Sequence, residues 1–244
     1  MTLALTLTEF KLFLREKIGP AFGVGFPVLL LVIFGNIPFY RKPDPTFGGL
    51  TLLDVYVPIL VAFVLAMLAL NTVPPALAGY RERGVLRRLR TTPVGPVRVL
   101  VAQLTLTAAM AVVAITSVLL VARFAFAVRL PKQFGGFLLT VLLAGAALIA
   151  MGLFAAAVSR TGKAANALGA TMFYPTMFFA GLFLPIDTMP PVLRHISHAT
   201  PLGAAVTALQ DATAGNWPHA LPLLTMAAYA LVFGAAAARL FRWE

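Results

Sequence analysis

The sequence predicts an all-α integral membrane protein with six transmembrane helices. Of its 244 residues, 60% are hydrophobic and only 11% are charged, whereas a soluble domain carries about 25% charged residues. The mean hydropathy of +0.92 agrees with this contrast. The apolar residues also lie in long runs without charge, and a helix needs roughly 20 such residues to cross the hydrocarbon core of a bilayer. An N-terminal amphipathic interfacial helix and short re-entrant helices between spans five and six complete the predicted fold.

Residues 1–19 predict an amphipathic helix that lies in the membrane interface. Leu3, Leu7, Phe10 and Leu14 repeat at helical spacing, and the charged residues of this segment lie largely off that stripe. A signal peptide would instead combine a short apolar stretch with a small-residue cleavage site. The alternative is a polar lead-in to the first span that frays.

Six charge-free runs follow, and they are the predicted spans of a single domain, residues 1–244. Their approximate bounds are 20–40, 55–80, 99–122, 133–159, 164–186 and 219–238. The longest connection, 187–218, contains four prolines but stays fairly apolar. We therefore expect it to form short helices that dip partly into the membrane.

The distribution of charge predicts a multi-pass protein of the cell membrane with both termini in the cytoplasm. The chain has 19 Lys and Arg residues against 8 Asp and Glu residues. With the N-terminus inside, 13 of the 19 basic residues fall in inner segments and 6 in outer ones, as the positive-inside rule requires. A basic cluster at 123–132 weakens this asymmetry without reversing it. Orientation and anionic lipid headgroups therefore explain the positive charge better than nucleic acid does.

The sequence offers no catalytic residue and no metal site. It contains no cysteine, which excludes disulfides and thiolate chemistry. The predicted spans also lack the ionisable side chains that ion-coupled transporters place in the membrane. Gly162-Lys163 is not preceded by the glycine loop of a nucleotide-binding P-loop. His195 and His198 are better interpreted as solvated loop residues than as metal ligands. We therefore expect neither an enzyme nor a bound cofactor.

The most informative segment is the basic loop after the second span, residues 81–93. It carries five arginines and one glutamate. Val85, Leu86 and Leu89 give it an apolar side, and a short helix here would end before Pro93, because the residue that precedes a proline disfavours the helical conformation. Two interpretations stay open on these residues alone. The arginines anchor the loop on lipid phosphates, or the helix docks in a groove of a cytoplasmic partner.

The loop resembles the cytoplasmic loop of the type-2 family of ATP-binding-cassette (ABC) permeases, in which the pattern E-[RK]-x-G-[TV]-L-x-x-L-x-x-[TS]-P recurs. The matching residues here are Arg81, Glu82, Arg83, Gly84, Val85, Leu86, Leu89, Thr92 and Pro93. A second segment, 181–209, is similar to that family's "GLFFP…LP…NPLTYAVEAL" region. Thr200 stands there where Asn is usual, and Gly203-Ala204 where Thr-Tyr is usual. The nearest subgroup is the drug-resistance branch typified by the daunorubicin exporter.

The resemblance implies the permease subunit of an ABC exporter that moves hydrophobic or amphiphilic, drug- or antibiotic-like compounds out of the cell. Two such chains, usually identical, would pair with two copies of a separate cytoplasmic ATP-binding subunit. That subunit would use ATP and Mg, while this chain binds no cofactor. Residues 81–93 would form the coupling helix seated on it, with Glu82 as the main charged contact. Cargo would pass between the two halves, lined mainly by spans two and five.

Aromatic, Met and Asn side chains in those two spans are the candidate pathway residues. They are Phe63, Met67, Asn71, Phe173, Met177 and Phe178. The first three recur every four residues along one helix face, and the others surround Pro175, a natural kink. Faces of this kind can repack around different amphiphiles, although lipid contact or bundle packing would produce the same pattern.

Apolar and small residues suggest two further features. Leu182, Phe183 and Leu184, at the outer end of the fifth span, are a candidate hydrophobic gate. Gly152 and Gly169 suit close packing between helices, inside one subunit or across a dimer.

Two other functions remain open. An exporter of a lipid or polysaccharide precursor would have the same architecture, with a wider or more polar pathway. A non-transport membrane scaffold would need no ATPase, so co-purification of an ATP-binding subunit would distinguish it from a transporter.

Overall fold

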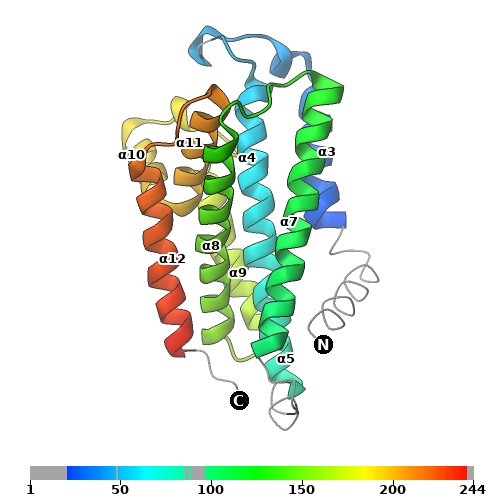
Figure 1. Ribbon diagram of the computed structural model, residues 1–244, viewed down its shortest axis with the longest axis vertical. Coiled ribbons are helices and arrows are strands. Elements are labelled where there is room, and N and C mark those ends of the chain that lie inside the picture. The colour runs from blue at the N-terminus through cyan, green and yellow to red at the C-terminus, as the bar shows by residue number, and fades with distance from the viewer. Residues whose placement is uncertain (1–20, 48, 86–87, 89–96, 241–244) are drawn as a thin grey trace.

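The computed structural model describes residues 21–47, 49–85, 88 and 97–240, and every regular element within these ranges is helical (Figure 1). Within these ranges, four helices are long and apolar enough to cross a membrane. They are the continuous helix Leu52–Glu82, α7 (Val97–Phe126), α8 (Phe134–Val158) and α12 (Ala220–Leu240). Each begins and ends within a few residues of a predicted span, so the all-helical membrane bundle is supported by these four helices.

The other two predicted spans correspond to helices that do not meet that criterion. Helix α3 (Phe26–Asn36) follows a short π-helix, η1 (Ala21–Gly25), and is followed by Ile37 in extended conformation before Pro38. Helix α9 (Gly162–Phe179) has 18 residues, but its first turn contains polar side chains. A total of six spans therefore stays a prediction. The predicted interfacial helix, 1–19, lies outside the described residues.

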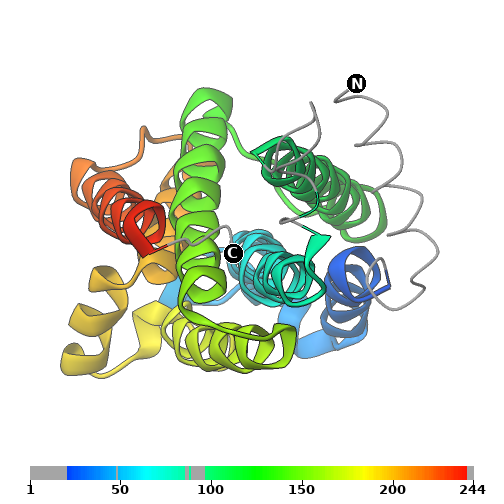
Figure 2. The same ribbon diagram turned by 90° about the horizontal axis from the view of Figure 1, so that it is seen from below.

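Helix α4 (Leu52–Ala66) lies at the centre of the bundle (Figure 2) and is buried along nearly its whole length. It contacts α3, α7, α8 and α11. A capping box starts it: the Asp54 N–H donates to Thr51 Oγ1 at 3.1 Å, and the Thr51 N–H donates to Asp54 Oδ2 at 3.0 Å. Such a cap contributes about 1 kcal/mol. The other Asp54 oxygen accepts from the Arg129 N–H at 3.2 Å, which ties the start of α4 to the connection between α7 and α8.

A π-helical turn, η4 (Met67–Thr72), joins α4 to α5 (Val73–Glu82). The Val73 N–H donates to the carbonyl of Leu68, five residues back. The next two residues, Pro74 and Pro75, have no N–H to donate. The helical ladder is therefore interrupted here, which is a common cause of π-bulges in long helices.

Two glycines of neighbouring helices pack against the carbonyls exposed by this interruption. A Cβ on Gly152 of α8 would lie 2.2 Å from the Ala69 oxygen, and a Cβ on Gly169 of α9 would lie 2.0 Å from the Leu70 oxygen. Only a residue without a side chain permits such close approach. The close packing expected of both glycines therefore occurs inside one chain.

The connection between α9 and α12 lies at the end of the bundle opposite α5 (Figure 1). It contains η5 (Ile186–Thr188), α10 (Pro191–Ala199) and α11 (Pro201–Ala214). Helix α11 is buried among α4, α8, α9 and α12. Two short 3-10 turns, η2 (Pro38–Arg41) and η3 (Pro45–Phe47), lie at the same end. The predicted short helices are therefore present, and their entry into the membrane stays a prediction.

Candidate functional site

The last turn of α5 binds the turn between α8 and α9 through two consecutive charged residues. The Arg81 guanidinium donates to the carbonyls of Ala156 at 3.3 Å and Ala157 at 3.5 Å, and also to the carbonyl of Ser159. These carbonyls belong to the C-terminal end of α8, where the final four have no intrahelical donor. A cation there also complements the negative end of the helix dipole. Arg81 therefore caps α8 from a neighbouring helix.

Glu82 makes the complementary contact with α9. Its Oε2 accepts a hydrogen bond from the Gly162 N–H, the first residue of α9, at 2.8 Å. Thr161 Oγ1 accepts from the Ala164 N–H at 3.1 Å in the same turn. A carboxylate suits this position because the N-terminus of a helix has free N–H groups and a partial positive charge. We call Arg81, Glu82 and the 156–162 backbone that they bind the clasp.

The residues after the clasp lead away from the bundle. The Arg83 guanidinium lies 5.6 Å from the centre of the Tyr80 ring, a cation–π contact. Gly84 has φ +67°, the left-handed conformation that ends helices, and its N–H donates to the Arg81 carbonyl at 3.0 Å. The Arg88 N–H then donates to the Gly84 carbonyl, four residues back, at 3.1 Å. Gly84 therefore lies just beyond the end of α5 in a helix-terminating conformation.

The structure brings together the first five of the predicted coupling residues, namely Arg81, Glu82, Arg83, Gly84 and Val85. Leu86 and Leu89 lie outside the described residues. The binding of Arg81 and Glu82 to the turn between α8 and α9 was not expected from the sequence. The sequence shows only an adjacent pair of opposite charges at the end of a predicted helix. It gives no sign of the partners, because their bonding atoms are backbone groups.

The pathway candidates separate into buried and exposed side chains. Phe63 of α4 and Phe173 of α9 are 4% and 6% exposed, and their ring centres are 5.7 Å apart in a T-shaped contact. Phe63 also contacts Phe26 of α3 at 5.8 Å. Met177 is buried in the same core. These side chains therefore pack α3, α4 and α9 together within one chain.

The π-turn holds the remaining candidates of the second span. Asn71 Nδ2 lies 3.7 Å from Met67 Sδ, a weak acceptor, and both side chains are half-buried. On α9, Phe178 is 40% exposed and belongs to an outward face with Ala167, Thr171 and Tyr174. A contiguous apolar and weakly polar face of α9 is thus left exposed by the other described residues.

The gate candidates follow α9 at the end of the bundle opposite the clasp. Leu182 is half-buried against the core, while Phe183 is 70% and Leu184 39% exposed. Gly181, at φ +90°, makes the turn that precedes them. The three residues thus form a turn with one anchored and two outward side chains.

Comparison with known protein families defines the class of this chain. The sequence model of the ABC-2 type transporter family matches residues 2–213. The match covers most of the chain, so the protein belongs to the ABC-2 type transporter family and is a membrane permease component rather than the ATPase itself. A comparison with curated proteins finds no match.

Proposed function

We propose that the protein is the permease subunit of an ABC exporter, driven by a separate ATP-binding subunit that docks on residues 81–93. The clasp is the observation that supports this most directly. A segment that only anchored the chain on lipid would need no attachment to the ends of two other helices, whereas a coupling segment must transmit displacement to them. The partner subunit holds ATP and Mg, and the two chain termini lie on its side of the membrane.

The clasp supplies a physical route for the displacement. Nucleotide-driven closure of two ATP-binding subunits pushes on the coupling segment. Gly84 allows the turn between that segment and α5, while Arg81 and Glu82 fix α5 to the ends of α8 and α9. Packed helices move as units because close-packed interiors deform little. A push on the coupling segment therefore moves the α8–α9 hairpin together with α5.

Movement of α9 changes its contact with α4. The Phe63–Phe173 pair and the Gly169–Leu70 contact join these helices. We place the pathway beside this contact, with the half-buried Met67 and Asn71 and the exposed Phe178 on its wall. Phe63, Phe173 and Met177 are buried and support that wall from within the chain, and the outer gate lies at 182–184. Two copies of the chain enclose this route, with the uncovered face of α9 toward the second copy. Its apolar character favours hydrophobic or amphiphilic cargo such as drugs, as in the drug-resistance branch of the family.

Reconstitution tests the proposal directly. The chain, co-expressed with a candidate ATP-binding subunit, is placed in proteoliposomes, and ATP-dependent movement of an amphiphilic dye is measured. We expect movement that stops when the ATPase subunit carries a disabled Walker lysine. Leu86→Asp should abolish co-purification of that subunit, while Leu224→Asn on an exposed face of α12 should not. Normal assembly and transport with Leu86→Asp would remove the docking assignment.

A further inference from the structure

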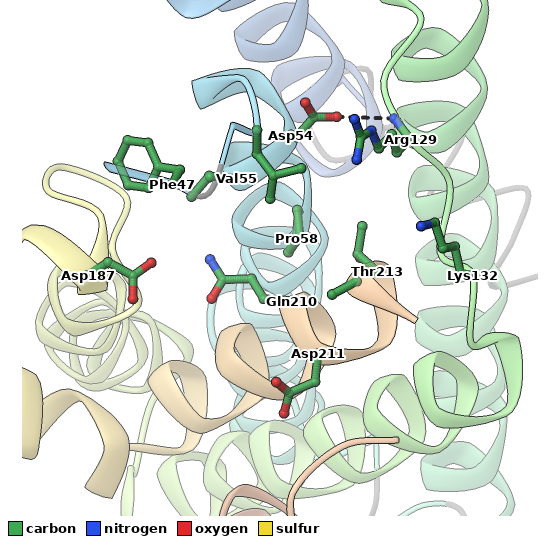
Figure 3. Close-up of a pocket in the computed structure, with 12 residues that line it drawn as sticks. Phe47, Asp54, Val55, Pro58, Arg129, Lys132, Asp187, Gln210, Asp211 and Thr213 are labelled. Atoms are coloured by element: carbon green, nitrogen blue, oxygen red, sulfur yellow. Dashed lines mark hydrogen bonds between the residues drawn. The ribbon is translucent and has the colours of Figure 1, made fainter. Parts of the chain in front are cut away.

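A cavity of about 510 Å³ opens at the end of the bundle opposite the clasp (Figure 3). Four separate segments form it: η3 with the first turns of α4, the connection between α7 and α8, η5, and the last turns of α11. Its volume lies within the range of small-molecule sites, about 300–1,000 Å³. Because four separate segments of the chain form its walls, the cavity depends on the tertiary fold and is not a gap beside one loop.

Three of its charged side chains have no partner in the part of the chain that the structure describes. Among the described residues, no ion pair or side-chain hydrogen bond involves the side chains of Arg129, Lys132 or Asp187, and all three are exposed. Arg129 and Lys132 lie on one side of the cavity, and Asp187 lies on the other (Figure 3). The cavity therefore presents positive charge on one wall and negative charge on the facing wall.

The other two carboxylates of the cavity already have structural partners. Asp54 accepts from the backbone N–H groups of Thr51 and Arg129. Asp211 Oδ2 lies 2.7 Å from His219 Nδ1 and also accepts from the His219 N–H at 3.3 Å. These contacts fix the walls, and they leave Asp187 as the carboxylate available to a ligand.

The floor between the charged walls is largely apolar. Val55 is 5% exposed, and Pro58 is buried beside it. Pro58 has no N–H, so the Asp54 carbonyl lacks the donor that an uninterrupted helix would supply. The half-buried amide of Gln210 adds one donor and one acceptor group at the centre of the cavity.

The charges that line the cavity do not suit a ligand that is only an anion or only a cation. Three carboxylates line the cavity and disfavour a lone anion, while the two basic side chains disfavour a lone cation. A molecule with both charges, separated by a short apolar linker, meets complementary groups on each wall and on the floor. Arg suits phosphate oxygens especially, because its planar guanidinium donates two parallel hydrogen bonds.

We propose that this cavity binds an aminoalkyl phosphate group, with the phosphate at Arg129 and Lys132 and the primary ammonium at Asp187. The methylene linker lies over Val55 and Pro58. Such a group occurs as the headgroup of phosphatidylethanolamine and also in soluble glycerophosphoethanolamine. The site lies in the permease alone and does not depend on an ATPase partner.

Binding to the purified full-length chain tests the proposal. In one arm, phosphatidylethanolamine is titrated into phosphatidylglycerol nanodiscs, and retained lipid is counted by native mass spectrometry. In the other, glycerophosphoethanolamine is titrated by calorimetry against glycerol 3-phosphate and ethanolamine. We expect glycerophosphoethanolamine, which carries both charges, to bind at least about tenfold tighter than glycerol 3-phosphate or ethanolamine, which each carry charge of only one sign. Each lost charge-assisted contact is worth about that factor. Retention of the lipid alone identifies a headgroup site, and binding of both probes identifies a site open to solution.

Variants separate this site from general attraction to lipid. Lys132→Gln and Asp187→Asn should each weaken binding about tenfold without changing elution volume or helix content, because neither side chain has a partner among the described residues. Arg123→Gln is the matched control, since this exposed arginine at the end of α7 does not line the cavity. Equal affinity in the two cavity variants and the control would overturn the proposal. Failure of both probes to bind, or glycerol 3-phosphate binding as tightly as the zwitterion, would overturn it as well.

Discussion

At the α5 end of the bundle, Arg81 and Glu82 direct their charges to the backbone of α8 and α9, whereas at the opposite end Arg129, Lys132 and Asp187 surround a cavity. In the first region each charge completes a helix terminus of the same chain. In the second, Asp54 and Asp211 accept hydrogen bonds from backbone N–H groups, while the side chains of Arg129, Lys132 and Asp187 have no partner in the described ranges. We therefore propose that the clasp transmits displacement between helices and that the cavity binds a ligand.

The largest expected effect comes from the packing that joins the two regions. Gly169→Ala places a methyl group against the Leu70 carbonyl, where the backbone cannot yield easily. We expect destabilisation of about 2–3 kcal/mol, measured by thermal unfolding of the purified protein. Gly145→Ala on α8 is the control, because its nearest neighbouring atom lies 4.0 Å away. Equal stability of the two variants would show that the helices do not need this close contact.

A smaller loss of stability is expected from the arginine of the clasp. Arg81→Gln removes a charged donor from the C-terminal carbonyls of α8. Hydrogen bonds to charged groups contribute about 1.5–3 kcal/mol, and partial solvent exposure of Arg81 reduces this to about 1–2 kcal/mol. Chemical denaturation would measure it. Arg83→Gln, which loses only the contact with Tyr80, should cost less than half as much, and a reversed order would contradict the structural role of Arg81.

Two variants of Glu82 test whether this residue acts through the clasp or through direct contact with the ATPase subunit. Glu82→Ala removes the acceptor of the Gly162 N–H, and we expect about tenfold slower ATP-driven transport with the ATPase still bound, equivalent to about 1.4 kcal/mol. Glu82→Gln keeps an amide oxygen that can accept the same bond, so it should retain most of the activity. If the two variants lose transport equally, the charge itself matters, and a contact with the partner explains it better than the clasp.

The smallest effect is expected at the proposed pathway between the two regions. Asn71→Ala removes a half-buried amide whose described contact is the weak one with Met67. It should change the relative transport of two dyes about threefold and leave basal ATP hydrolysis unchanged, since the clasp is intact. Thr105→Ala on α7, whose hydroxyl bonds to the Val101 carbonyl of its own helix, is the control. An unchanged dye preference would remove Asn71 from the pathway.

The helices themselves were predictable because run length and hydrophobicity are properties of contiguous sequence. The starts and ends of α7, α8 and α12 follow from where charged and turn residues interrupt those runs. Burial was less predictable. Phe63 and Phe178 both belong to apolar stripes, yet one is enclosed by α3 and α9 while the other faces outward. Periodicity identifies a stripe, but it does not identify what covers it.

Neither the clasp nor the cavity could be predicted from the sequence. Glu82 binds a backbone group 80 residues away, and a backbone N–H has no distinctive side chain. The cavity gathers Arg129, Lys132 and Asp187 from connections in which isolated charges are ordinary. Only tertiary contacts bring them to one place, and each alone is indistinguishable from a solvated loop residue.

The shortness of the turn between α8 and α9 has a consequence for biogenesis. Only Ser159, Arg160 and Thr161 separate the two helices, so, with α9 as the predicted fifth span, we expect the pair to enter the bilayer together as a helical hairpin. Arg81 and Glu82 leave the ribosome about 80 residues before the groups they bind. We therefore expect the clasp to close only after the hairpin has been inserted, as a late step of folding.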